Sequence, residues 1–265
     1  MKRVSRWFSR NLIRIYMALG FIYLFVPIAY TFAFSFNDYV KSNLVWREFT
    51  LDNWKNPCGV LDICPALGNS IKIGLLSTLI ATILGTMIAF AIGRYAFTGR
   101  AATNTLIFLP MASPELVLGA SLLTIFLGLG FNLGFWTIVI AHVMFCISFI
   151  VVTVKARIAS LDPRLEQAAM DLYADERETF RRVTFPLVAP GIAGAALLAF
   201  SLSFDDFIIT NFNSGTTITF PLYVYSHAER GLPAQANVIG SSMFFIAMTI
   251  VILGQIVSRK TKVAK

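Results

Sequence analysis

Apolar residues fill six long stretches of the chain, and shorter polar stretches separate them. A helix needs about 20 predominantly apolar residues to cross the hydrocarbon core of a bilayer. Lipid offers the backbone no hydrogen-bond partners, so each stretch must be a helix or part of a closed barrel. The stretches are continuously apolar rather than alternating, which excludes the barrel. The pattern predicts an all-α integral membrane protein, a single transmembrane domain over residues 1–265, with six spans at about Ile15–Phe34, Ile71–Ile92, Thr105–Leu127, Phe135–Val154, Leu187–Ile209 and Val238–Val257.

Composition agrees with this pattern. Hydrophobic residues make up 57% of the 265 residues and charged residues only 14%, whereas a soluble domain has about 25% charged residues. The net charge of +8 is compatible with nucleic-acid binding. The basic residues lie at the edges of the apolar stretches, however, as they do in proteins that are oriented in a membrane. We therefore expect membrane lipid, and no nucleic acid, as a partner.

The distribution of Lys and Arg predicts the orientation. If the N-terminus lies in the cytoplasm, 17 of the 22 basic residues fall on the inside, and the outside holds only Lys41, Arg47, Lys55, Lys72 and Arg230. Cytoplasmic segments carry the excess of Lys and Arg. Both termini are thus predicted to be cytoplasmic.

The first outside loop contains two cysteines in the sequence PCGVLDICP. Cys58 and Cys64 fall on the predicted oxidising side, where a disulfide is chemically permitted. Two free thiols in a loop are the alternative, and the residues alone do not decide between them. No cysteine or histidine spacing predicts a metal site.

The polar segment between spans four and five, residues 155–186, keeps helical spacing. Asp162 and Pro163 are typical of a helix start, and an apolar stripe follows at Leu165, Ala168, Ala169 and Leu172. A second helix is predicted to start at Asp175, with a turn before it, and Pro186 is expected to stop or kink the chain. The stripe is either a surface for a partner or the inner face of a hairpin that packs on its own spans.

This segment resembles the cytoplasmic loop of permease subunits of ABC importers, which has the form E-A-A-x3-G-x9-I-x-L-P. The chain has Gln167-Ala168-Ala169, Tyr173, and Val183-Thr184-Phe185-Pro186 in the same frame. Gln167 replaces the Glu of the motif, beside Glu166, and Tyr173 replaces the Gly, at a turn where a positive φ suits glycine better. The resemblance implies a coupling helix that docks on an ATPase subunit, through Glu166, Gln167, Ala168, Ala169, Asp171, Leu172, Tyr173, Phe180 and Pro186.

Further stretches are similar to spermidine/putrescine importer permeases, and to the second of their two permease subunits in particular. They are SPELVLGASLL, GFWTIVIAHVMFCISFIVVTVKARI, LSFDDFIITNF and PLYVYSHAERGLPAQAN. The resemblance implies a multi-pass protein of the bacterial inner or plasma membrane. Its implied partners are a second permease subunit, an ATPase dimer and an extracytoplasmic solute-binding protein. The chain lacks the G-x-x-x-x-G-K-[ST] loop that holds nucleotide phosphates. ATP and Mg²⁺ are therefore expected on the partner ATPase, with no cofactor and no covalent chemistry on this chain.

Three carboxylates fall inside predicted spans, at Glu115, Asp205 and Asp206. Ionisable residues in spans are costly and usually face a cavity or a partner. Carboxylates match the ammonium groups of a polyamine, and aromatic faces match both its cations and its methylenes. Trp136, Phe204 and Phe207 are candidates for such faces. The alternative is structural: Asp206 hydrogen-bonds across helices and Glu115 is protonated or paired. In that case the aromatic residues and Cys146 serve packing, and His142 is a hydrogen-bonded packing residue.

Three other interpretations remain open. The permease could carry another small solute, such as an organic cation, an amino acid-like compound or an iron complex. An ion-driven secondary transporter is compatible with the intramembrane acids, although the coupling loop argues against it. An intramembrane enzyme would need clustered catalytic side chains, and only His142 and Cys146 join the three acids, without catalytic spacing.

Overall fold

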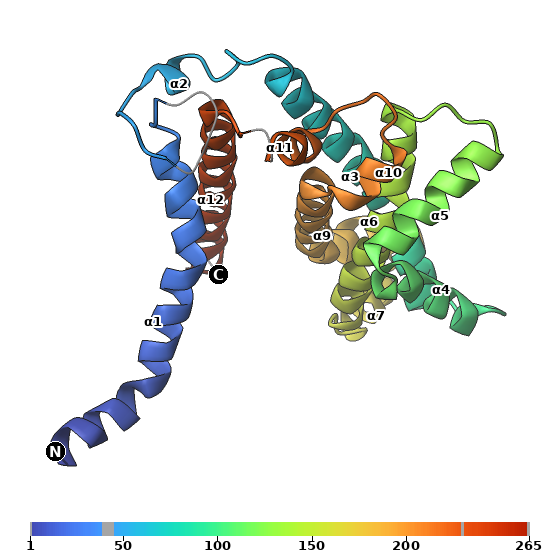
Figure 1. Ribbon diagram of the computed structural model, residues 1–265. Coiled ribbons are helices and arrows are strands. Elements are labelled where there is room, and N and C mark those ends of the chain that lie inside the picture. Colours follow the sequence, from blue (N-terminus) through green and yellow to red (C-terminus); the bar gives the residue numbers. More distant parts are fainter. Residues whose placement is uncertain (1, 39–44, 229–230, 264–265) are drawn as a thin grey trace. The chain divides into compact units, whose positions relative to one another are not determined.

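The computed structural model describes residues 2–38, 45–228 and 231–263, and most of these are helical (Figure 1). Their one β-type pairing is an isolated bridge between Asn37 and Phe49. Among the basic residues counted for the orientation, Lys41 and Arg230 of the predicted outside and Lys265 of the predicted inside lie outside the described residues. The elements are α1 (Lys2–Phe34), α2 (Asp52–Lys55), α3 (Ile63–Arg94), α4 (Arg100–Ala112), α5 (Glu115–Gly128), α6 (Phe135–Ala159), α7 (Arg164–Asp171), α8 (Glu176–Thr179), the π-helical turn η1 (Phe180–Thr184), α9 (Phe185–Asp205), α10 (Ile208–Asn213), α11 (Phe220–Ala228) and α12 (Ala234–Val263).

Five helical segments of the described chain are long and apolar enough to cross a membrane, and the bent pair α4–α5 makes a sixth. The predicted all-α membrane fold is confirmed. Two of the six spans are not continuous helices, however. The third breaks between Ala112 and Glu115 with a bend of 107°, and the fifth ends at Asp205 before α10 starts at Ile208. On which side the two termini lie stays a prediction.

The chain divides into two compact units, which we call the terminal unit (Met1–Cys64 with Val224–Lys265) and the central unit (Pro65–Tyr223). The single transmembrane domain stays a prediction. In the terminal unit α1 packs along α12, and α2 also contacts α12. Buried Asn53 fixes α2 because its Nδ2 donates to the carbonyls of Ser35 and Asn37, while its Oδ1 accepts from Gln235.

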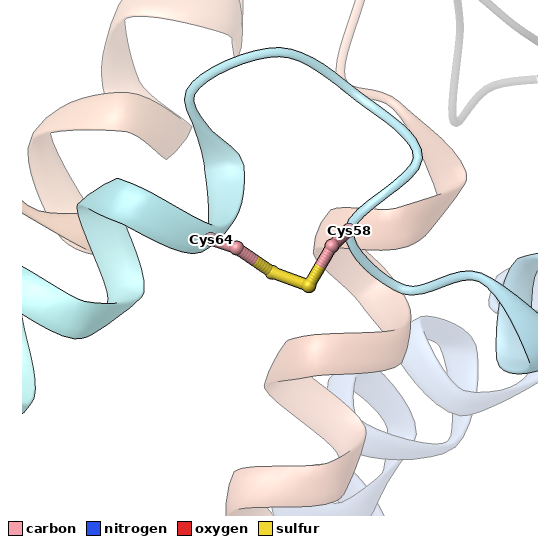
Figure 2. Close-up of a disulfide and its surroundings, with 2 residues drawn as sticks. All are labelled: Cys58 and Cys64. Atoms are coloured by element: carbon pink, nitrogen blue, oxygen red, sulfur yellow. A yellow bond between two sulfur atoms is a disulfide. The ribbon is translucent and has the colours of Figure 1, made fainter.

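A disulfide joins Cys58 to Cys64 between α2 and the first turns of α3 (Figure 2). Their Cα atoms are 5.4 Å apart, within the usual range for a bridge. The structure therefore has the bonded form of the two alternatives left by the sequence. A stable disulfide is typical of an oxidising compartment, which supports placing this loop on the outside.

The central unit is built around α6. Its buried residues pack against α4, α9 and α10. Cys146 lies in this core, fully buried. The close fit of α10 against α5 depends on Gly119, because a Cβ there would lie 2.9 Å from a ring carbon of Phe212 and 3.3 Å from the Cα of Ile209.

Candidate functional site

The polar segment between α6 and α9, Pro163–Thr184, begins with the helix that its sequence predicts. Helix α7 starts at Arg164, whose backbone N–H donates to the Asp162 carboxylate at 2.9 Å. The second start is also as predicted: Asp175 is the N-cap of α8, and its carboxylate accepts from the backbone N–H of Glu178 at 2.6 Å. We refer to Pro163–Thr184 as the interspan segment.

The turn after α7 explains the position of Tyr173. The N–H of Ala174 donates to the carbonyl of Ala169, and the N–H of Tyr173 donates to that of Met170. This pair of bonds is the Schellman motif, in which the residue after the C-cap adopts the left-handed conformation. Tyr173 has a φ of 65°, so the position where the resembled motif has Gly does require a positive φ.

Pro186 does not stop the helix, so that half of the expectation for this residue is wrong, and a kink there stays a prediction. The helical path runs on from α8 through η1 into α9, and Pro186 occupies the first turn of α9. A proline lacks a backbone N–H and crowds the preceding turn. The wider π-helical turn Phe180–Thr184 lies immediately before it, and local π-helical adjustments can re-satisfy the backbone groups that a proline frees in a membrane helix.

One side of the interspan segment is fastened to the central unit. Both guanidinium Nη atoms of Arg94, the last residue of α3, bond to the Glu166 carboxylate of α7, and the hydroxyl of Thr184 donates to the same carboxylate. The ring of Phe180 packs edge-on against Phe90 of α3, with centroids 5.2 Å apart. Glu166 therefore acts as an anchor between three elements, a role that the sequence did not predict for Arg94 or Thr184.

The other side of the interspan segment is open. Leu172 is 81% exposed and Tyr173 is 98% exposed, and Gln167, Ala168 and Asp171 are also exposed. Of the predicted stripe, only Ala169 is half-buried. A hairpin that packed on its own spans would cover these apolar side chains. Their exposure favours the partner surface of the two alternatives.

The three intramembrane carboxylates lie where two spans are broken. Glu115 is the first residue of α5, at the bend from α4, and Asp205 and Asp206 end α9 just before α10. Glu115 lies within electrostatic range of both aspartates. We call these three residues the acidic junction. Broken spans with ionisable groups at the break are typical of solute and ion pathways.

Within the acidic junction the two aspartates have different surroundings. Asp206 is buried, and its carboxylate accepts from the backbone N–H groups of Ile209 and Thr210 and from the Thr210 hydroxyl. It thereby caps α10. Asp205 and Glu115 are exposed. The sequence left open which aspartate faces a neighbouring helix, and the structure identifies it as Asp206.

His142 is the centre of a buried polar network, which agrees with the expectation of a hydrogen-bonded packing residue. Its side chain is 1% exposed, and Nε2 lies 3.2 Å from an oxygen of Asp206 and 3.0 Å from the Thr210 hydroxyl. Its Nδ1 lies 2.7 Å from the Ser203 hydroxyl, which in turn lies 2.8 Å from that of Ser77. The network joins α3, α6, α9 and α10, and it holds both sides of the break after Asp205.

The aromatic candidates are only partly near the acids. Phe207 is the N-cap residue of α10 and directly follows Asp206, and Phe204 precedes Asp205 and stacks on Phe200. Trp136 is 65% exposed, and its ring packs on Phe135. Within the described part of the chain, Trp136 makes no hydrogen bond or ring contact with the carboxylates. Five of the six predicted pathway residues thus belong to the chain segments at the two breaks, and Trp136 belongs to the first turn of α6.

Residues 81–261 match the family described as binding-protein-dependent transport system inner membrane component. The chain belongs to this family. It is a permease of the inner membrane with several membrane-spanning helices. Relatives with full-length similarity include the spermidine/putrescine transport system permease protein PotC of Haemophilus influenzae, 33% identical over 97% of this chain and 99% of the relative. PotC of Escherichia coli strain K12 is 32% identical over 93% of this chain and 94% of the relative.

A related permease and two solved structures extend the comparison. The putrescine transport system permease protein PotI of Escherichia coli strain K12 is 32% identical over 85% of this chain and 83% of its own length. A bacterial ABC transporter for alginate import has a chain with a TM-score of 0.69 at 16% identity, covering 95% of this chain and 97% of that one. A chain of the MetNI methionine ABC transporter has a TM-score of 0.61 at 13% identity, covering 74% of this chain and 94% of that one. These structures show that the permease has the fold of ABC transporter subunits.

Proposed function

We propose that this permease is half of the membrane path of an ATP-driven importer for polyamines. A second permease subunit forms the other half, an ATPase dimer supplies the energy, and an extracytoplasmic binding protein delivers the solute. ATP and Mg²⁺ bind to the ATPase, and this chain carries no cofactor. The observation that carries the proposal is the interspan segment, with one side anchored through Glu166 and the other side exposing Leu172 and Tyr173.

The interspan segment has the properties that coupling requires. A coupling element must be fixed to the spans it moves and free toward the subunit that moves it. The pair between Arg94 and Glu166 connects α7 to the end of α3, and η1 continues directly into α9. A shift of α7 would therefore reach two spans through short, rigid links. In our mechanism, ATP binding closes the ATPases, α7 follows them, and the spans open outward to accept solute.

The acidic junction supports a cationic solute. Asp205 and Glu115 are the exposed carboxylates at the two breaks, while Asp206 is engaged in the buried network. A polyamine carries several ammonium groups along a methylene chain, so it suits spaced carboxylates with aromatic faces beside them. The relatives named for spermidine and putrescine transport support this solute class for the present permease.

The test is uptake of labelled spermidine and putrescine in cells that lack this gene. We expect the intact gene to restore uptake, Leu172→Met to restore it as well, and Leu172→Asp to fail although the protein reaches the membrane. Uptake should stop when ATP is depleted and persist for a short time with a proton uncoupler, whereas a secondary transporter gives the reverse. If the intact gene restored uptake of neither polyamine, the proposed substrate would be wrong. Normal uptake with Leu172→Asp would refute the proposed coupling role.

A further inference from the structure

A pocket with a basic lining lies at the end of the central unit that carries the interspan segment. It has a volume of about 270 Å³, and its lining includes Arg94 at the end of α3, Arg100 at the start of α4 and Lys155 near the end of α6. Three cations from three helices thus surround one pocket. No carboxylate is part of its lining among the described residues.

Two of these cations are available to a ligand. The charge of Arg94 is largely offset by its bond to Glu166. The guanidinium group of Arg100 has no hydrogen-bond or ion-pair partner within the described chain, and Lys155 donates to the neutral amide oxygen of Asn104 at 2.7 Å. An ammonium group has three N–H donors, so Lys155 keeps two for a ligand. The pocket therefore presents about two positive charges to an anion.

A second, apolar groove of about 240 Å³ continues from this pocket. Lys155 and Ala159 line both spaces, and the groove runs along the seam of α4 and α6 past Ile107, Phe108 and Val152. On α4 the lining residues run from Arg100, at the start of the helix, to Phe108. On α6 they run from Lys155, near the end of the helix, back to Val151. On both helices they therefore extend from a helix end toward the middle of a span. The basic pocket thus lies at the membrane boundary, and the apolar groove extends from it into the hydrocarbon region.

We propose that this pocket and groove bind one anionic phospholipid of the bilayer leaflet next to the interspan segment. Its phosphate lies between Arg100 and Lys155, and an acyl chain lies in the α4–α6 groove. A free phosphate or a soluble anion would use the basic pocket and leave the apolar groove empty, so the continuity of the two spaces selects a lipid. Basic pockets between helices at a membrane surface bind such headgroups by charge.

The site has a mechanical consequence. Arg94 belongs both to this pocket and to the pair that anchors Glu166, and Pro163 at the start of the interspan segment lines the same pocket. A bound headgroup therefore touches the element that we assign to coupling. Lipid occupancy is expected to stabilise the junction of α3, α4, α6 and α7.

The experiment uses the full-length chain purified in detergent, stripped of lipid, and titrated with phosphatidylglycerol or phosphatidylcholine while bound lipid is counted by native mass spectrometry. We expect tight binding of one phosphatidylglycerol and at least tenfold weaker binding of phosphatidylcholine. Each basic residue near a membrane surface contributes roughly a fivefold factor, so Arg100→Gln with Lys155→Gln should weaken phosphatidylglycerol binding roughly thirtyfold. The matched control, Arg177→Gln with Arg181→Gln, removes two exposed charges from the interspan segment outside the pocket and should bind normally.

The groove is tested separately. Ala156→Phe fills it from α6, and the same exchange at exposed Ala193 of α9 serves as control. We expect weaker phosphatidylglycerol binding with Ala156→Phe only. If Arg177→Gln with Arg181→Gln weakened phosphatidylglycerol binding as much as Arg100→Gln with Lys155→Gln, the lipid would be held by general attraction to a basic surface. That result would refute the proposed site. If Ala156→Phe left phosphatidylglycerol binding unchanged and inorganic phosphate competed with the lipid, the basic pocket would be a site for a soluble anion instead.

Discussion

Arg94 and Glu166 lie 72 positions apart in the sequence and form a two-pronged ion pair that fastens α7 to the end of α3. The side chains are only 31% and 18% exposed. Paired bonds between a guanidinium and a carboxylate are stronger and more directional than single ones. This contact is therefore the best-defined mechanical link between the interspan segment and a span.

Breaking the Arg94–Glu166 pair should reduce transport more than stability. Arg94→Gln and Glu166→Gln each remove the charge-assisted bonds, and we expect each to lower polyamine uptake severalfold while the apparent Tm falls by only a few degrees. The double variant should be little worse than either single one, with a coupling energy of about 1 kcal/mol. Thermal unfolding in detergent and uptake in cells measure the two effects. Additive losses would show that the residues act independently.

Tyr173→Gly should be tolerated or slightly stabilising. A non-glycine residue in the left-handed conformation costs roughly 1–2 kcal/mol, and glycine removes that cost but loses about 0.5–1 kcal/mol of chain entropy on folding. The side chain is 98% exposed, so little packing is lost. Tyr173→Val is the informative contrast, since a β-branched residue is poorly suited to a φ of 65°.

The Tyr173 variants also separate turn geometry from docking. If Tyr173→Gly keeps its stability and loses uptake, the exposed ring itself contacts the ATPase. If stability and uptake are both unchanged in Tyr173→Gly, this position serves only the backbone conformation of the turn. A fall in the apparent Tm with Tyr173→Gly larger than with Tyr173→Val would contradict the Schellman assignment.

Gly119 should not accept a side chain. A Cβ at this position meets Phe212 and the backbone of Ile209, and overpacking of this kind costs about 1–3 kcal/mol. We expect Gly119→Ala to lower the apparent Tm by several degrees. Gly128→Ala, near the end of the same helix and with nothing within 4 Å of the added atom, should be neutral. Equal Tm values for the two variants would mean that α5 and α10 do not pack this closely.

Strong local patterns predicted much of this molecule. The six apolar stretches, the capped starts at Asp162 and Asp175, and the turn at Tyr173 are each encoded within a few residues. The break between Ala112 and Glu115 could be predicted only in part. Pro110 and Pro114 indicate that the helix is weakened there, but they do not indicate a bend of 107°. At Pro186 the sequence left a stop or a kink open, and it did not indicate that a π-helical turn continues the helix, because such a turn has no clear sequence signature.

Contacts distant in the sequence were the part that could not be predicted. In the sequence, Arg94 is one of many basic residues that flank the apolar stretches. Only the structure shows that α7 brings Glu166 into contact with it. His142 and Asp206 are 64 positions apart, and nothing local to either residue indicates the other. The acidic junction could be proposed from composition alone, whereas the division of roles between Asp205 and Asp206 depends on tertiary packing.

Cysteine labelling should fix the orientation. In intact cells, a membrane-impermeant maleimide should label Cys58 and Cys64 only after reduction, because they are bonded and predicted to face outward. Cys146 is buried in the core and should stay unlabelled until the protein is denatured, which provides an internal control. Labelling of the pair only after the membrane is broken would reverse the predicted topology.

Neutralising the two neighbouring aspartates should give two different defects. Asp206 accepts from two backbone N–H groups and a hydroxyl and faces His142. Asp206→Asn replaces one acceptor oxygen by an N–H donor, so a buried group loses its partner at a cost of about 1–3 kcal/mol. We expect a lower apparent Tm and less assembled protein. Asp205 is exposed beside Glu115, and Asp205→Asn should leave the Tm unchanged.

Uptake then distinguishes the roles of the two aspartates. With assembly confirmed, Asp205→Asn is expected to reduce spermidine uptake more than putrescine uptake, because spermidine has one more ammonium group to balance. Combining it with Glu115→Gln should deepen that loss without affecting stability. If Asp205→Asn with Glu115→Gln transports both polyamines normally, the exposed carboxylates do not serve the cation. The acidic junction would then be a structural feature around the His142 network, and the polyamine assignment would rest on the relatives alone.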